Sequence, residues 1–452
     1  MDDSITPAAL SWLCAVLAER FGQPFRLQAE EGPRLRLFLQ GSDRSITTIA
    51  DPQTFARNDS ELAFTDWDAR AEGWHFPIDS RIPAPGANRL PSPLITPSVD
   101  GYHINYDILG LTFWMLTRQE EIGRTDLDDH GRFPATASHA FKHGYLERPI
   151  VDEWLAILRQ VIKHTWPGIA LAQHQFRVRL SHDVDRPSRY GFGGIKHLLR
   201  TVGGDVLKRR ELFSLLHGPV AWKMAPAALH SLDPYNTFDW IMDLSEANNL
   251  QSAFYFICGR TNSKYDSNYE IEDPAIRSLL RSISSRGHEI GLHPSYETYL
   301  NANALKQEAE RLLRVCQEEG IAQSQWGGRM HYLRWSHPTT LKAWARAGMN
   351  YDSTLGYADR PGFRCGTCFE YPAYDPLEKK ILDIRIRPLV VMEGTVIAKS
   401  YLGLGWGKDA EREFIALKDN CRRVNGLFTI LWHNSELRSK EALNLYERIV
   451  SS

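Results

Sequence analysis

The chain has 452 residues, of which 43% are hydrophobic and 24% are charged, values typical of a soluble globular protein with two or three domains. Its 53 Lys and Arg residues balance 55 Asp and Glu residues, so the chain as a whole produces no basic field that attracts nucleic acid or anionic lipid over long range. We therefore expect neither a nucleic-acid partner nor insertion into a membrane.

The N-terminal segment, residues 1–20, predicts an amphipathic helix. It begins with acidic side chains and lacks the basic region of a secretory signal, and no apolar run in the chain reaches the ~18 residues of a membrane span. Six scattered cysteines make no disulfide framework, and we interpret Cys365 and Cys368, an isolated C-x-x-C pair, as structural. These features predict a cytoplasmic protein.

The organisation of the chain changes near residue 170. Before this point the pattern predicts two short strands and two helices, at 35–39, 45–50, 109–121 and 151–163. This half contains no cluster of reactive side chains. We expect an N-terminal α/β domain of unknown function over residues 1–170 and a second domain over residues 171–452.

After residue 170, short apolar stretches alternate with longer amphipathic ones, which indicates parallel β/α units. The predicted strands cover residues 176–184, 252–257, 288–292, 350–353 and 427–432. The predicted helices cover residues 237–248, 274–285, 304–319, 339–347 and 410–425. The pattern fits a (β/α) barrel or a doubly wound sheet, and in both folds ligands bind at the carboxyl ends of the strands.

Two acids, Asp183 and Asp185, end the first of these strands. Because successive side chains of a strand alternate between its faces, both acids point to the same side. Two carboxylates held this close need a cation between them or a raised pKa on one of them. The pair is therefore a candidate for a metal ligand and a general base.

Polar residues also follow other predicted strands. His293 and His433 each close a strand, and Arg329 and His331 lie in the segment Gly327-Gly-Arg-Met-His-Tyr332. Each of these residues alone is as readily explained by a structural hydrogen bond or a surface ion pair. Their convergence at neighbouring strand ends favours a shared site. By strand phase, His182 and His288 face away from these groups and are predicted to be structural.

Residues 172–452 resemble the NodB-like polysaccharide deacetylases (carbohydrate esterase family 4), which hydrolyse N-acetyl groups of carbohydrates with a divalent metal. Four segments carry the resemblance in chain order: Ser181-His-Asp-Val-Asp185, Gly287-His-Glu-Ile-Gly-Leu-His-Pro-Ser-Tyr-Glu297, Arg329 with Tyr332, and Leu431-Trp-His433. The resemblance implies a distorted (β/α) barrel of the glycoside hydrolase/deacetylase type behind the smaller N-terminal α/β domain. The N-terminal half, with Asp107-Ile-Leu-Gly-Leu and His130-Gly-Arg-Phe-Pro, is similar to an uncharacterised domain found ahead of such deacetylases in bacteria.

The resemblance also implies roles for individual residues. Asp183 would be the base, Arg329 would orient it, and His433 would be the acid. Asp185 and His293 would bind a divalent metal, expected to be zinc. Tyr332 and Trp335 are candidates for contact with an N-acetylated sugar or glycan.

The chain departs from the family at Glu297, where a second metal-binding histidine is usual. A carboxylate binds zinc at nearly the same distance as an imidazole, so Glu297 is one candidate for the third ligand and His331 is the other. A site without metal is a third possibility. The alternatives to a metal-dependent deacetylase are thus a metal-free amidohydrolase acting on another C–N bond and an inactive carbohydrate-binding homologue. The oligomeric state is left open.

Overall fold

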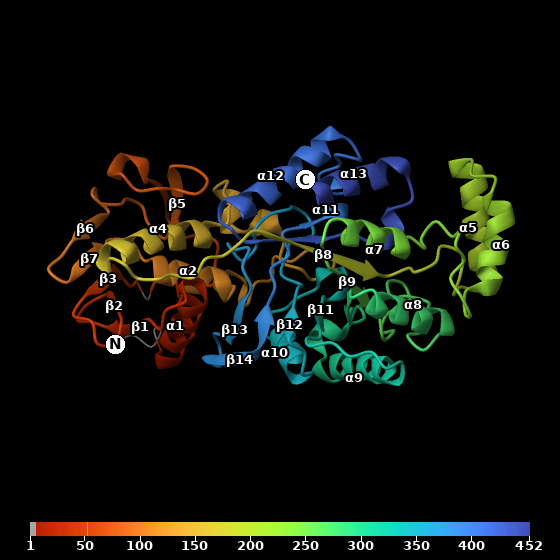
Figure 1. The fold of residues 1–452 in the computed structure, drawn as a ribbon, viewed down its shortest axis with the longest axis horizontal. Coiled ribbons are helices and arrows are strands. Elements are labelled where there is room, and N and C mark those ends of the chain that lie inside the picture. The colour runs from red at the N-terminus through yellow and green to blue at the C-terminus, as the bar shows by residue number, and fades with distance from the viewer. Residues whose placement is uncertain (1–5, 52) are drawn as a thin grey trace. The chain divides into compact units, whose positions relative to one another are not determined.

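The computed structural model describes residues 6–51 and 53–452, which divide into two compact units (Figure 1). Unit 1 contains the residues up to 177 together with 355–390 and 416–428, and unit 2 contains 178–354, 391–415 and 429–452. Both units combine helices with strands, so the predicted α/β class is confirmed. The domain division at residue 170 stays a prediction, because compactness alone does not show which part of a chain folds independently.

Unit 1 is built around a five-stranded sheet with the order β1-β2-β3-β7-β6, in which only β3 and β7 run parallel. Its elements are α1 (Pro7–Phe21), β1 (Arg26–Ala29), β2 (Arg34–Phe38), β3 (Ser45–Ile49), β4 (Phe64–Asp68), β5 (Arg81–Pro85), β6 (Ile95–Pro97), β7 (Gly101–Ile104), α2 (Ile108–Leu116), α3 (His139–Lys142), α4 (Ile150–Thr165), β13 (Tyr371–Asp375) and β14 (Lys380–Ile386). The predicted N-terminal helix is confirmed from Pro7 onward, and residues 1–5 lie outside the described residues.

The hairpin of β13 and β14 packs on the N-terminal part of unit 1. The indole N–H of Trp12 donates to the carbonyl oxygen of Pro372 at 2.8 Å, and the hydroxyl of Tyr371 donates to the carbonyl oxygen of Leu116 at the same distance. The buried Glu121 carboxylate accepts hydrogen bonds from two arginines, Arg118 and Arg364. A segment that lies between Arg329 and His433 in sequence is therefore part of the core of unit 1.

Unit 2 contains seven neighbouring strands in the order β12-β11-β10-β9-β8-β16-β15. The strands are β8 (Arg177–Val184), β9 (Ser252–Phe256), β10 (Glu289–Leu292), β11 (Gly327–Gly328), β12 (Tyr351–Asp352), β15 (Val391–Met392) and β16 (Leu427–Leu431), of which β8 and β16 have their first one and first two residues in unit 1. The helices are α5 (Ile195–Gly204), α6 (Ser214–Met224), α7 (Phe238–Ala247), α8 (Pro274–Ser285), α9 (Ala302–Glu318), α10 (Thr339–Arg346), α11 (Glu393–Ile397), α12 (Lys408–Arg423), which extends into unit 1, and α13 (Lys440–Ser451).

All five predicted strands and all five predicted helices of the second half are confirmed, with ends within about two residues of those expected. Pairing is parallel between β8 and β9, β9 and β10, β10 and β11, and β11 and β12. The sequence pattern missed the two-residue strands β11 and β15, the hairpin strands β13 and β14, and the helices α5, α6, α11 and α13. Among the described residues, no helix combines the length and the apolar character needed to cross a membrane.

Candidate metal centre and active site

The carboxyl ends of the parallel strands are aligned, and this alignment gathers the site residues. Val184 of β8 pairs in register with Phe256 of β9, which pairs with Leu292 of β10, which in turn pairs with Gly328 of β11. Side chains at or just beyond these four positions therefore meet along one edge of the sheet. All of the candidate residues discussed below belong to unit 2.

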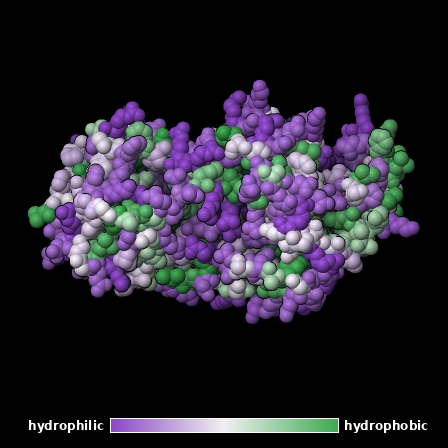
Figure 2. Space-filling model, viewed as in Figure 1, coloured by the Kyte–Doolittle hydropathy of each residue, from purple (hydrophilic) through white to green (hydrophobic). Residues whose placement is uncertain are grey.

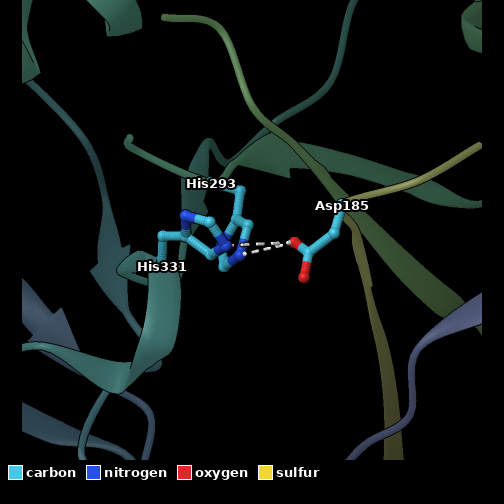
Figure 3. Close-up of side chains that lie close together, drawn as sticks. All are labelled: Asp185, His293 and His331. Carbon is cyan, nitrogen blue, oxygen red and sulfur yellow. Dashed lines mark ion pairs between the residues drawn. The ribbon is translucent and has the colours of Figure 1, made fainter. Parts of the chain in front are cut away.

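Three side chains form a group that could hold a metal ion: Asp185, His293 and His331, whose potential ligand atoms all lie within 4.8 Å of one another. Asp185 Oδ1 is 3.2 Å from His293 Nε2 and 3.6 Å from His331 Nε2. Figure 3 shows the two imidazole rings pointing at the carboxylate from different segments. The arrangement offers one oxygen and two nitrogens to a cation.

The outer nitrogens of both rings are already engaged. His293 Nδ1 lies 2.6 Å from the carbonyl oxygen of Arg329, and because a carbonyl only accepts, this nitrogen carries the proton. His331 Nδ1 likewise donates to the carboxylate of Asp266 at 3.0 Å. In the neutral rings the lone pairs therefore sit on the Nε2 atoms, which face Asp185. Partners of this kind fix the tautomer and the ring orientation of metal-binding histidines.

Two buried atoms of the group lack a hydrogen-bond partner among the described residues, as is expected of atoms that bind a metal ion. Asp185 Oδ1 and His331 Nε2 make no hydrogen bond of acceptable geometry within the part of the chain that the structure describes. Burial disfavours a charged imidazole, but the carboxylates of Asp185 and Asp266 outweigh it and raise the pKa of His331 to about 9. A proton then occupies the group in the absence of metal, and a divalent cation would replace it.

Asp183 lies beside this group and is held by a buried arginine. Its Oδ1 accepts a hydrogen bond from Arg329 Nη1 at 2.8 Å, and both side chains are almost completely buried. The guanidinium also donates to the hydroxyls of Ser181 and Ser353 at 2.9 and 3.1 Å. A buried charge pair whose guanidinium makes these additional hydrogen bonds fixes the position of the carboxylate.

On another side of Asp185 lies His433, whose Nε2 is 3.7 Å from Asp185 Oδ2. Its Nδ1 is 2.5 Å from Glu393 Oε1, at the start of α11. Burial lowers the pKa of His433, but Glu393 and then Asp185 and Asp183 raise it to about 10. At neutral pH this imidazole is therefore protonated and can donate a proton.

Glu297, one of the two candidates for the third ligand, lies outside the group. Its carboxylate accepts from Arg334 at 2.9 Å and from the side-chain amide of Asn262 at 3.3 Å, and about half of its side chain (48%) is exposed. Of the two alternatives that the sequence left open, His331 is the residue that the structure brings to Asp185 and His293.

The two predicted sugar-contacting residues differ in accessibility. Tyr332 is half-buried and packs edge-on against the rings of Tyr265 and Tyr296, with centroids 5.2 and 5.3 Å away. Trp335 is only 3% exposed, so its ring offers no face on which a sugar could stack. Tyr332 therefore remains a candidate for substrate contact, whereas Trp335 packs inside the protein.

Sequence reasoning missed Glu393 and Asp266, the carboxylates behind His433 and His331. Glu393 follows the two-residue strand β15, which is too short to produce a recognisable pattern. Asp266 lies in a loop where it also accepts hydrogen bonds from the backbone of Thr261, Asn262 and Tyr296, and a loop acid of this kind reads as a turn residue. No local signal distinguishes either of them.

Comparison with known proteins gives limited matches. The model of a family of unknown function, DUF7033, matches residues 13–167, which lie in unit 1. No curated protein matches the chain.

Three solved structures are similar over part of the chain, each covering 63% of this chain and 85% of its own. One is described as a polysaccharide deacetylase from Mycobacterium smegmatis, at 16% identity and a TM-score of 0.39. The second is the allantoinase PuuE, at 15% identity and a TM-score of 0.35. The third is described as a polysaccharide deacetylase from Pseudomonas aeruginosa PAO1, at 14% identity and a TM-score of 0.35. The chain is similar to these structures, and at such TM-scores the similarity does not reveal its reaction.

Proposed function

We propose that this chain is a metal-dependent hydrolase that removes an N-acetyl group from a carbohydrate. The observation that carries the proposal is the group of Asp185, His293 and His331, which lies between an arginine-held carboxylate and a protonated histidine. Cleavage of an amide needs an activated water, a proton acceptor and a proton donor. The motifs of the sequence are similar to those of enzymes that carry out this reaction.

The ligand set suits a divalent cation, and zinc is the expected one. Catalytic zinc sites commonly have three protein ligands of the carboxylate and imidazole type and leave a fourth position open. When bound, such a cation lowers the pKa of a water molecule toward neutrality and polarises a carbonyl oxygen. Asp185, His293 and His331 would hold it.

Asp183 is the proposed proton acceptor. Its Oδ1 is occupied by Arg329, which leaves Oδ2 to receive the proton of the attacking water. Arg329 orients the carboxylate, because its own position is fixed by hydrogen bonds to Ser181 and Ser353. It is a positioning residue and does not itself need to touch the substrate.

His433 is the proposed proton donor. An amide nitrogen leaves poorly as an anion, so it must gain a proton as the C–N bond breaks. Glu393 holds His433 through Nδ1, which turns the protonated Nε2 toward Asp185 and the group around it. We place the acetamide between Asp183 and His433, with the sugar near Tyr332. We also propose a cytoplasmic location, with which six cysteines that form no disulfide are consistent.

Removal of the metal tests the proposal directly. The protein is treated with a chelator, dialysed, and assayed for acetate release from a panel of N-acetylated sugars before and after zinc is added back. We expect activity to fall at least a hundredfold and to return with zinc, because the water loses the cation that activates it. Undiminished acetate release from metal-free protein contradicts the metal dependence, and release of another product from another C–N bond contradicts the substrate class.

Replacing Glu393 with glutamine changes the pH dependence of the same reaction. The negative charge of Glu393 helps to raise the pKa of His433 to about 10, so its loss lowers that pKa. The acid form of His433 is then lost at lower pH, and the alkaline limb of kcat/KM is expected to move down by about one pH unit or more. The acid limb is expected to stay in place.

The matched control is Glu411→Gln, which removes a carboxylate that pairs with Arg448 on the surface. It is expected to leave both limbs unchanged. An unshifted alkaline limb in Glu393→Gln would show that His433 does not donate the proton.

A further inference from the structure

A helical hairpin between β8 and α7 plays no part in the proposed reaction. It consists of α5, a π-helical turn at Asp205–Arg209, and α6. Its turn is held by the buried Asp205 carboxylate, which accepts hydrogen bonds from Arg189 Nε at 2.8 Å and from the Tyr190 hydroxyl at 3.0 Å, both in the segment before α5. Arg189 in turn donates to the hydroxyl of Tyr235, beyond the hairpin, at 2.7 Å. The turn is therefore linked to the segment before α5 and, through Arg189, to the segment after α6.

Only a small apolar core lies inside the hairpin. It contains Tyr190, Leu198, Val202 and Ala221, with Val206 and Trp222 partly buried against it. Most of the large apolar side chains point outward instead. Of the 17 exposed large hydrophobic residues in the described part of the chain, ten lie within residues 195–232: Ile195, Leu199, Leu207, Leu212, Phe213, Leu215, Leu216, Val220, Met224 and Leu232.

Figure 2 shows hydrophobic atoms gathered over the place that α5 and α6 occupy in Figure 1. Leu207 and Phe213 are 82% and 75% exposed. Helix α6 carries only Ser214, His217 and Lys223 as polar side chains. A helix that is apolar on nearly all sides is normally covered, and a concentrated exposed apolar patch marks an interaction surface.

The charges around this patch indicate which kind of partner surface suits it. Residues 195–224 contain six Lys and Arg residues against two acids, whereas the whole chain has a net charge of −2. One of the acids, Asp205, is buried and paired with Arg189. Six cations of the same segment are exposed, of which Arg209 also pairs with Asp205: Lys196, Arg200, Lys208, Arg209, Arg210 and Lys223. A second copy of the hairpin would bring like charges together, whereas a surface of lipid phosphates would neutralise them.

We infer that this hairpin binds the surface of an anionic lipid bilayer. Its leucines and Phe213 enter the boundary between the headgroups and the acyl chains, and its lysines and arginines meet the lipid phosphates. It lies on the membrane and does not cross it. The balanced charge of the whole chain is compatible with this binding, because screening limits each lipid contact to charges within about 10 Å of the surface.

Sedimentation of the full chain with lipid vesicles tests the inference. We expect binding to vesicles of phosphatidylcholine and phosphatidylglycerol in equal amounts, and binding at least tenfold weaker to phosphatidylcholine alone. The double variant Phe213→Ser with Leu216→Ser removes exposed apolar groups. It is expected to weaken the binding to both kinds of vesicle at least tenfold. Lys208→Gln with Lys223→Gln is expected to weaken only the binding to the anionic vesicles, by about 30-fold.

The matched control is Leu300→Ser with Leu377→Ser, which removes two leucines of similar exposure outside the hairpin and should bind like the unmodified protein. Circular dichroism checks that every variant is folded. The inference is overturned if the unmodified protein does not sediment with anionic vesicles. It is equally overturned if the Phe213/Leu216 variant sediments with them to the same extent as the unmodified protein. It is also overturned if, without vesicles, the protein is a dimer that this variant converts to monomers, because a second copy then covers the patch.

Discussion

Asp183→Asn is expected to lower kcat/KM by about 10³-fold, within the range that a lost general base typically costs. The amide keeps the shape of the carboxylate but cannot accept a proton from water. Asp183 is not in the group that offers ligand atoms to a metal, so the affinity for zinc should change by no more than a few-fold. Steady-state kinetics and zinc titration by calorimetry measure the two quantities separately.

The same substitution leaves the buried guanidinium of Arg329 without its charge partner, so thermal unfolding is followed in parallel. Ser353→Ala is the matched control, because it removes one hydrogen bond to Arg329 while Asp183 keeps its charge. Its activity should fall by less than about tenfold, since one neutral partner of the guanidinium is worth about 1 kcal/mol. If folded Asp183→Asn keeps more than a tenth of the activity, Asp183 is not the proton acceptor.

His331→Ala is expected to weaken zinc binding more than a hundredfold and to abolish activity at low zinc. Loss of a partner behind a ligand already costs about 10- to 100-fold in affinity, and loss of the ligand itself costs more. The measurement is zinc affinity by competition with a chelating dye, which does not depend on knowing the substrate. Excess zinc should restore part of the activity, because Asp185 and His293 still face the site.

Glu297→Ala is the control for this prediction, since the carboxylate of Glu297 pairs with Arg334 away from the group. It should bind zinc as the unmodified protein does. The reverse result, with zinc affinity lost in Glu297→Ala and kept in His331→Ala, would assign the third ligand to Glu297 and contradict the geometry described above.

The regular part of the second half could be predicted because its signals are local. The pattern contains apolar runs of strand length, each followed by an amphipathic run of helix length. Polar residues at the ends of the apolar runs were therefore predicted to lie at strand ends, and Asp183, Asp185, His293 and His433 do so. The alternation of side chains along β8 also assigned His182 correctly to the opposite face. Its Nδ1 contacts the carbonyl oxygen of Trp432 at 2.8 Å, and burial lowers its pKa to about 3.

The third ligand could not be chosen from the sequence because alternation ends where the strand ends. β11 stops at Gly328, and the chain then turns through Tyr332 and Leu333, both in the left-handed region with φ of 61° and 55°. No periodicity tells which way His331 points inside such a turn. The spacing that suggested Glu297 crosses irregular backbone between the end of β10 and the 3-10 helix at Thr298–Leu300.

The remaining differences between the sequence-based expectations and the structure arise from contacts and charges that are far apart in the chain. The pairing of residues 355–390 with the N-terminal part of unit 1 joins positions hundreds of residues apart, which no local pattern reports. The basic, apolar hairpin was hidden by a charge sum over the whole chain, since its cations are offset by acids elsewhere. The C-x-x-C segment was predicted to be structural, and both thiols are buried.

The three residues from Arg329 to His331 serve both halves of the proposed chemistry. The carbonyl oxygen of Arg329 orients one imidazole of the metal group, its guanidinium holds Asp183, and His331 supplies the other imidazole. Binding of the metal and orientation of Asp183 therefore both depend on the two peptide bonds that join residues 329 to 331. An insertion or deletion in this tripeptide would remove both at once, so natural variants with altered length there should have neither function and should not pass through a half-active form.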